Sequence, residues 1–394
     1  MLRGVATLGP ALPVLAAISF VSSLGISIML PLLPLYGLSL GATPLQLGLM
    51  TSAFAVMNSV GQFGAGMLID RLGSRRFILG GTAVYAAANG LIATAPTALA
   101  LIGYRGVAGL GAGSNIIATR LYISQTADPA RLAFLNSIIS AATSAGNVMG
   151  PAIGGLVAVA ADLRTPFFIV AGTSALALVA ALFLPRPARQ VHLPRPAGER
   201  VWTRSVLVLF AANLFLLIGF GGWITSYAPF ATTRLGWTTF DVGIIFTVFG
   251  IGDITLGPWL GHLADRTGRR RMAVLASIPV FFFGFALVLG LPRPVIYAVS
   301  FITGAALTAF NASWFALLTT AVPAARRGRV FGTVSAVANG GTVIGALGAS
   351  ALWQAYDVGY GMVLASCAVL LGGLTMLLLP GELRPTTPGS GAAG

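Results

Sequence analysis

The amino-acid sequence predicts an all-α integral membrane protein with twelve transmembrane helices in two pseudo-symmetric six-helix halves. The composition, the length of the apolar runs and an internal repeat lead to this prediction. Of the 394 residues, 56% are hydrophobic and 8% are charged, and the mean hydropathy is +0.90. Soluble domains contain about 25% charged residues. A helix that crosses a bilayer needs roughly 20 mostly apolar residues, and the chain offers many such runs.

Apolar runs separated by Gly, Pro or charged residues define the twelve predicted helices. The first half is expected to hold helices at 11–36, 45–68, 77–95, 98–124, 134–161 and 166–184. The second half is expected to hold them at 205–228, 240–263, 272–291, 295–320, 330–353 and 359–380. The first run is charge-free and too long for the apolar core of a signal peptide, so we expect a retained helix. Strands of a membrane barrel would alternate over about ten residues, and these runs are too long and too uniformly apolar for that.

The distribution of positive charge predicts the topology. All 23 basic residues are arginine, and they fall mainly in alternate short loops. Cytoplasmic loops carry such an excess, so both termini are placed in the cytoplasm. The net charge of +14 is thereby explained without a nucleic-acid partner. We expect a first half over 1–184, a Pro- and Arg-rich cytoplasmic linker over 185–204, a second half over 205–380 and a cytoplasmic tail over 381–394.

A charged phrase recurs at matching places in the two halves. GMLIDRLGSRR spans residues 66–76 and GHLADRTGRRR spans 261–271, so the copies differ by 195 in residue number. Each joins the second and third helices of its half. Parallel six-helix repeats are one layout of secondary transporters, with the substrate site near the midplane between the repeats. The pattern G-x-x-x-D-R-x-G-x-R-R resembles the signature loop of the major facilitator superfamily.

This resemblance implies a conformational latch that stabilises an outward-facing state. A glycine lets a neighbouring helix approach closely, the Asp can pair with nearby arginines or with a helix N-terminus of the other half, and the second glycine suits a tight turn. The alternative is that the charges only fix topology, but an Asp placed identically twice argues against it. The predicted latch residues are Gly66, Asp70, Arg71, Gly73, Arg75, Arg76, Gly261, Asp265, Arg266, Gly268, Arg270 and Arg271.

Arg105 lies about eight residues into the fourth predicted helix, in the outer half of the bilayer. A charge there costs at least ~2.5 kcal/mol. Its counterpart in the second half, near Phe301, is expected to be apolar. Gly109 and Gly113 follow on the same helix face. The stretch resembles the R-x-x-x-G motif of proton-coupled family members, which implies a role for Arg105 in proton coupling. A structural arginine bonded to carbonyls is the alternative.

The fifth predicted helix contains GNVMGPAIGG, residues 146–155. Its small residues share a face, and Pro151 bends the helix. Such a face would suit a helix that slides against the other half, although plain small-residue packing would also explain the glycines. The stretch resembles the antiporter motif of drug:proton exporters, which favours export over import. Its residues are Gly146, Gly150, Pro151, Gly154 and Gly155.

Asp253 is the acidic residue that we place deep in a span, 12 residues before Asp265 in the sequence and so ~18 Å deeper. Asn58 is its counterpart by the repeat. An intramembrane carboxylate is a candidate proton carrier, so Asp253 joins Arg105 as a proton-coupling candidate. The alternative is a structural Asp bonded to a neighbouring polar side chain.

Polar and aromatic residues in the predicted spans are candidates for a substrate cavity, although each can also bond between helices or anchor at the interface. The candidates are Asn58, Asn115, Asn136, Asn147, Asn213, Tyr227, Asn311, Trp314 and Asn339. Many multidrug antiporters for cationic compounds carry an acidic residue in helix one. Here that helix has serines and no acidic residue, which weakens both a cationic-drug assignment and a borrowed coupling scheme.

Together these features predict a secondary active transporter, a proton-coupled exporter of drugs or metabolites by alternating access. The alternative is a proton-coupled or facilitated importer of a sugar or other small metabolite, but the motif P-E-S-P-R of sugar importers is missing after helix six. A chain without Lys cannot supply the G-x-x-x-x-G-K-[ST] of an ATP-driven pump. We expect a small-molecule substrate, protons as coupling ion, a monomer in a bacterial inner membrane, and no enzyme activity, cofactor, metal or nucleic-acid partner.

Overall fold

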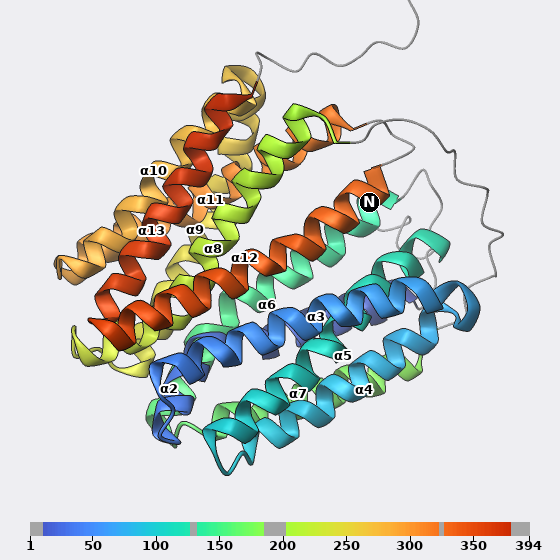
Figure 1. Cartoon of the computed structure of the whole chain (residues 1–394). Helices are drawn as coiled ribbons and strands as arrows, with labels where there is room; N and C mark the ends of the chain where they lie inside the picture. The colour runs from blue at the N-terminus through green and yellow to red at the C-terminus, as the bar shows by residue number, and fades with distance from the viewer. Residues whose placement is uncertain (1–10, 127–131, 185–201, 323–326, 380–394) are drawn as a thin grey trace, which may run out of the picture.

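A computed structural model describes residues 11–126, 132–184, 202–322 and 327–379, and these residues form twelve long helices and no strand (Figure 1). The first six are α2 (Ala11–Ser39), α3 (Pro44–Leu72), α4 (Ser74–Ala93), α5 (Ala98–Thr126), α6 (Leu132–Ala160) and α7 (Thr165–Leu182). The other six are α8 (Arg204–Thr233), α9 (Thr239–Thr267), α10 (Arg269–Val288), α11 (Arg293–Ala321), α12 (Arg327–Ala355) and α13 (Val358–Thr375), which continues into the 3-10 turn η3 (Met376–Leu378). The predicted all-α fold with twelve helices is confirmed.

Nine of the helices in the described part of the chain are long and apolar enough to cross a membrane. The remaining three are α4, α5 and α12. Most of the predicted linker and the whole predicted tail lie outside the described residues, so these boundaries stay predictions.

The second helix of each half begins and ends in the same way. A capping box starts both helices, formed by Thr43 with Gln46 in α3 and by Thr238 with Asp241 in α9. The backbone N–H of Thr43 donates to Gln46 Oε1 at 2.9 Å, and that of Thr238 donates to Asp241 Oδ2 at 3.0 Å. These bonds satisfy backbone donors that a helix start leaves unpaired.

Both of these helices end at a glycine with positive φ, 86° at Gly73 and 105° at Gly268. The predicted tight turns at these glycines are confirmed, because only glycine adopts such a backbone conformation without steric cost. The helices run further than predicted, to Leu72 and Thr267, so the Asp-Arg pairs belong to the last helical turn. The loop is shorter than we expected because a single glycine reverses the chain.

The internal repeat extends to helix packing. At the crossing of α3 with α5, Gly109 lies against the carbonyl of Phe54, and at the crossing of α9 with α11, Gly304 lies against the carbonyl of Phe249. Neither glycine leaves room for a Cβ. Both residues of the first pair are 195 positions before those of the second. The same close backbone approach therefore builds both halves.

The halves pack together mainly through α6 with α9, α3 with α12, and α2 with α8. In Figure 1, α6 and α12 run through the middle, while α10, α11 and α13 lean away from α4, α5 and α7.

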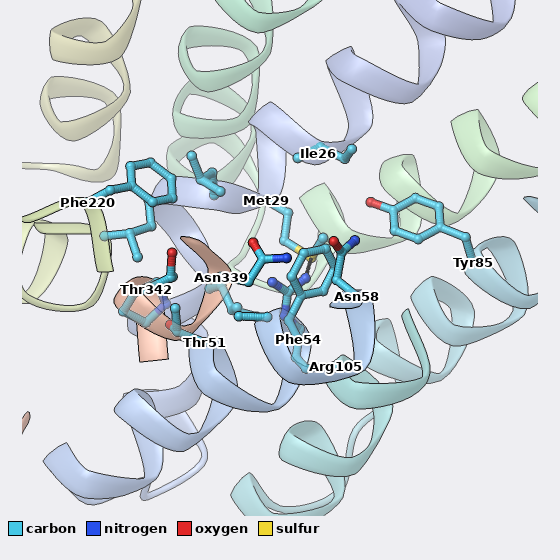
Figure 2. A pocket seen from close by; sticks show the side chains of 15 residues that line it. Ile26, Met29, Thr51, Phe54, Asn58, Tyr85, Arg105, Phe220, Asn339 and Thr342 are labelled. Atoms are coloured by element: carbon cyan, nitrogen blue, oxygen red, sulfur yellow. Dashed lines mark hydrogen bonds between the residues drawn. The ribbon is translucent and has the colours of Figure 1, made fainter. Parts of the chain in front are cut away.

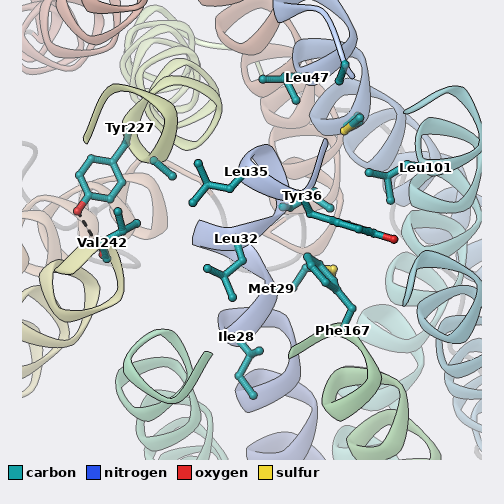
Figure 3. Packing of buried hydrophobic residues seen from close by; sticks show 14 of the residues in the cluster. Ile28, Met29, Leu32, Leu35, Tyr36, Leu47, Leu101, Phe167, Tyr227 and Val242 are labelled. Atoms are coloured by element: carbon teal, nitrogen blue, oxygen red, sulfur yellow. Dashed lines mark hydrogen bonds between the residues drawn. The ribbon is translucent and has the colours of Figure 1, made fainter. Parts of the chain in front are cut away.

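Three clusters of buried apolar residues show where the halves are joined. One cluster is shared, and in it Tyr227 and Val242 of the second half pack around α2 with residues such as Leu32 and Phe167 of the first half (Figure 3). The other two clusters each belong to one half, around Tyr122 in the first and around Phe310 in the second. Close packing of side chains is a main source of helix association in a membrane, so the bundle is joined at the end where the shared cluster lies and divided at the other.

Candidate functional site

A cavity of about 240 Å³ lies between the halves (Figure 2). Helices α2, α3, α4 and α5 of the first half and α8 and α12 of the second contribute to its wall. Its polar lining is Thr51, Asn58, Tyr85, Arg105, Asn339 and Thr342, and its apolar lining is Ile26, Met29, Leu30, Leu33, Pro34, Phe54, Ala55, Phe220 and Ile224. None of these lining residues is acidic.

Arg105 is the charged group of this cavity. It is buried, with 7% of its surface exposed, and its guanidinium carbon lies 4.2 Å from the centroid of the Phe54 ring. Nη1 donates a weak hydrogen bond to Met29 Sδ at 3.7 Å, and Nε has no partner among the described residues. A cation–π contact contributes ~0.5–2 kcal/mol, less than the several kcal/mol that burying an ion costs. Arg105 is thus held in the cavity wall without a counter-ion.

The carbonyl bonds that a purely structural Arg105 would make are missing from the described contacts of this side chain. The repeat also corrects our expectation of an apolar counterpart to Arg105 in the second half. The residue 195 positions later is Ser300, which is polar. Ser300 is buried and donates to the carbonyl of Ile245 at 3.1 Å. The second half therefore forms the equivalent crossing with a small neutral side chain.

Two pairs of polar side chains link the halves beside the cavity. Asn339 Nδ2 on α12 donates to Ser59 Oγ on α3 at 2.8 Å, and the hydroxyls of Thr51 and Thr225 lie 3.4 Å apart. Nearer the joined end, Thr247 donates to the carbonyl of Val148 at 3.0 Å. Hydrogen bonds between apolar helices are worth on the order of 1 kcal/mol each, so they orient the halves without locking them.

Asp253 does not line this cavity. It is partly buried on α9 and accepts a hydrogen bond from the Thr308 hydroxyl on α11. The structure therefore separates the two proton-coupling candidates, Arg105 in one half and Asp253 in the other. The bond to Thr308 is the contact that a structural Asp would make, and a part of Asp253 in coupling stays a prediction.

The latch charges whose contacts the structure describes are bonded within their own half. Asp265 Oδ1 accepts from Arg269 Nε at 2.8 Å, within its own half, and both side chains are well exposed. Gly66 and Gly261 face open space, and no described atom of a neighbouring element lies within 4 Å of the position that a Cβ would occupy. The described helices therefore show no close approach at these glycines, which we expected from the sequence. The side chain of Asp70 lies outside the described residues.

The remaining latch arginines divide into two groups. Arg75 donates to the carbonyls of Leu184 and Leu182 at 2.6 and 2.8 Å, and Arg270 donates to the carbonyl of Leu377. Their neighbours in the two loops are exposed, namely Arg71, Arg76, Arg266 and Arg271.

The glycine face of the antiporter-like stretch packs differently from our expectation. Gly146, Gly150 and Gly154 lie against the backbone and side chains of α2, in the same half. The other half is contacted by Gly155, which lies against Thr239, and by Pro151, whose carbonyl meets Gly243. The sliding face was predicted from the i, i+4, i+8 row, but the helix is rotated so that this row faces α2.

The chain matches the family model described as "Major Facilitator Superfamily" over residues 15–239 and 209–394. The chain belongs to the major facilitator superfamily. It is therefore a multi-pass membrane transporter, built from the parallel six-helix repeats of that family.

Relatives of this transporter include proteins named for drug resistance. It is 24% identical over 292 residues to "Multidrug resistance protein 2" of Bacillus subtilis (strain 168), covering 68% of this chain and 72% of the relative. It is 26% identical over 350 residues to "Multi-drug resistance efflux pump PmrA homolog" of Lactococcus lactis subsp. lactis (strain IL1403), covering 83% and 84%. A crystal structure of nucleoside transporter NupG matches with a TM-score of 0.76 at 14% identity over 93% of this chain and 99% of that one, and it shows the fold alone.

Two of the predicted cavity residues of the transporter, Asn58 and Asn339, line the cavity. Most of the others bond between helices instead. Asn115 donates to Thr82 at 2.7 Å, Asn147 accepts from Ser27 at 2.8 Å, Tyr227 donates to the Val242 carbonyl at 3.2 Å and Trp314 donates to the Leu209 carbonyl at 2.7 Å. Asn213 is half-buried and Asn311 is exposed, and neither lines this cavity. The side chain of Asn136 lies outside the described residues.

Sequence reasoning missed most of the transporter's cavity wall, yet a signal was present. Thr51, Phe54, Ala55 and Asn58 are spaced i, i+3, i+4 and i+7 and share one face of α3. Once Asn58 is chosen, helical spacing leads to the other three. Nothing comparable in the sequence brings α12 to the same cavity.

Proposed function

We propose that the protein is a proton-coupled exporter of small molecules that works by alternating access in a bacterial plasma membrane, with both termini in the cytoplasm. One observation carries the mechanism: the halves share a buried apolar cluster at one end only and enclose a cavity between them. A site that opens to one side at a time needs a joint of this kind. With the termini inside, the joined end is the outer one, and the structure represents an inward-facing conformation.

The direction of transport is supported by two features. The relatives at the family level are named as resistance proteins and an efflux pump. The stretch from Gly146 to Gly155 resembles the antiporter motif of drug:proton exporters, and its last glycine and Pro151 contact the other half at the joined end. Export of a small molecule in exchange for protons accounts for both features.

Asp253 is the carboxylate that we assign to proton coupling. It sits within α9, partly buried, and its hydrogen-bond partner is a neutral hydroxyl rather than an arginine. An acidic side chain within a membrane span is a candidate member of a proton relay. Proton uptake from outside and release inside would then accompany the rocking of the halves.

Purified protein in liposomes with an imposed pH gradient tests this proposal. Asp253→Asn removes the carboxyl group and keeps the side-chain shape. Asp162→Asn is the matched control, because it makes the same change in the turn before α7, where an Asn oxygen can still accept from the backbone N–H groups of Arg164 and Thr165. Proton flux is recorded on addition of lipophilic drugs, sugars, amino acids or carboxylates.

Wild type and Asp162→Asn should move protons opposite to at least one compound, and Asp253→Asn should lose this flux while remaining folded in size-exclusion chromatography. Coupled flux that persists in Asp253→Asn would remove the assignment of that residue. Substrate and protons moving in the same direction would instead identify an importer.

A further inference from the structure

We propose that the central cavity binds an organic anion, a hydrophobic carboxylate whose charged group pairs with Arg105. This inference deepens the proposed function and rests on the cavity being the transport site. Three observations support it. The cavity wall holds a cation without a counter-ion, the equivalent position in the other half is neutral, and most of the remaining lining is apolar.

The cavity holds a positive charge that no described protein group neutralises. The three ion pairs among the described residues are Arg234–Asp357, Arg269–Asp265 and Arg293–Asp241, and all lie at helix ends. Arg105 has Nε without a partner and Nη1 on a sulfur atom, and it lines a cavity without an acidic residue. A buried guanidinium has five N–H donors and no way to lose its charge, so an anion is the complementary ligand.

Packing of the fold does not require this arginine. The crossing of α9 with α11 repeats the crossing of α3 with α5, down to the glycine against the phenylalanine carbonyl, and it has Ser300 at the place of Arg105. The repeat therefore acts as an internal comparison. Since the same crossing forms with a neutral hydroxyl, the cation of the first half is placed for a ligand and not for the crossing.

The remaining lining residues indicate what the uncharged part of the ligand should be. Phe54 and Phe220 stand on opposite helices of the cavity, and α2 adds aliphatic side chains (Figure 2). Asn339 and Thr342 on α12 also line the cavity and supply neutral polar groups, and Asn339 is the nearer of the two to Arg105 in Figure 2. A cationic drug would meet the like charge of Arg105 with no carboxylate to offset it. An apolar molecule that carries one carboxylate fits each part of the wall.

The volume limits the size of the ligand in this conformation. A cavity of about 240 Å³ equals the volume of roughly eight water molecules at ~30 Å³ each. A single aromatic ring with a short carboxylate chain is of this scale, and 4-phenylbutyrate is a suitable probe. Its amide, 4-phenylbutyramide, is neutral and nearly the same in shape, and 4-phenylbutylamine carries a positive charge on a carbon chain of the same length.

Calorimetric titration of the purified full-length protein in detergent, without a pH gradient, measures the affinity for the three probes. We expect the carboxylate to bind at least tenfold more tightly than the amide and the amine. Arg105→Gln should remove this preference and leave the amide affinity within twofold. Arg204→Gln is the control, since it removes an exposed arginine away from the cavity.

A second variant keeps the test valid where Arg105→Gln fails to fold. Asn58 lines the same cavity and donates to the carbonyl of Gly109, one helical turn from Arg105. Asn58→Asp supplies a counter-ion from within the protein, so it should abolish the carboxylate preference. A carboxylate that binds no better than the amide to wild type, or a preference that survives in Asn58→Asp, would overturn the proposal.

Binding and coupling can fail separately. Loss of the anion preference with intact proton exchange of another compound would refute the ligand class and leave the exporter standing. Anion binding without proton-coupled flux would refute the exporter and leave the anion site standing.

Discussion

Arg75 and Arg270 perform the same task in the two halves. Each follows the glycine turn after the second helix of its half, and each donates to carbonyls at the C-terminal end of the sixth helix, Leu182 and Leu184 in one half and Leu377 in the other. Positive charge at a helix C-terminus satisfies orphan carbonyls and complements the helix dipole. These two arginines of the signature loop therefore join the second, third and sixth helices within a half.

Replacing either arginine should weaken its own half. Hydrogen bonds to charged donors contribute ~1.5–3 kcal/mol when buried, and partial exposure reduces this here, so we expect a loss of about 1 kcal/mol in Arg75→Ala and in Arg270→Ala. The melting temperature of the purified protein, followed by size-exclusion chromatography after heating, measures it. Arg76→Ala and Arg271→Ala are matched controls with exposed side chains, and an equal loss in the controls would contradict the assignment.

Gly243 decides how closely the halves meet at the joined end. The carbonyl of Pro151 occupies the space that a Cβ would need. Gly243→Leu should therefore separate the halves there and favour the opposite conformation, while each half keeps its own apolar cluster. Gly80→Leu is the control, because no atom lies within 4 Å of its Cβ position.

Thiol labelling measures this shift. In a Cys367→Ser background, a cysteine introduced at Asn339 in the cavity wall reports access from each side of the membrane. We expect outer-side labelling of the Asn339→Cys protein to rise at least several-fold with Gly243→Leu and to stay constant with Gly80→Leu. Unchanged labelling in both would show that the joint does not depend on this contact.

Asp357 gives the joined end a pH-dependent contribution to stability. Burial alone would raise the pKa of its carboxyl, but hydrogen bonds from Arg234 and from the Gly359 N–H outweigh burial and hold the pKa below its usual value. A carboxyl with a depressed folded-state pKa stabilises above the unfolded pKa of about 4 and loses this as the pH falls through the folded value.

Asp357→Asn keeps a capping oxygen and removes the charge. Exposed ion pairs are worth ~0.2–1 kcal/mol, so we expect a small loss of stability at pH 7 that vanishes well below pH 4. Asp357→Ala also loses the N-cap of α13, which costs ~0.5–2 kcal/mol. Melting temperatures at both pH values check this, and a constant difference for Asp357→Asn across the range would contradict an ionic origin.

The two charged residues within the spans show that a candidate functional residue can be predicted from the sequence while its contacts cannot. Arg105 and Asp253 were found because a charge among apolar residues stands out in composition alone. Their partners could not be predicted: Phe54 and Met29 around one, Thr308 around the other. A side chain's neighbours depend on the rotation of each helix about its axis, and nearly uniformly apolar helices carry little periodicity to reveal it.

The membrane class, the twelve helices, the repeat of 195 residues and the glycine turns could all be predicted, because they follow from composition, local capping and backbone conformation. Which polar residues meet depends on the folded arrangement of the helices. Asn58 and Asn339 reach one cavity although 281 positions separate their numbers, whereas Asn115 and Asn147 turn to neighbouring helices. The rotation and tilt of each helix depend on its whole interface with its neighbours, including glycines such as Gly109 and Gly243 where backbones touch. No local stretch of sequence contains that information.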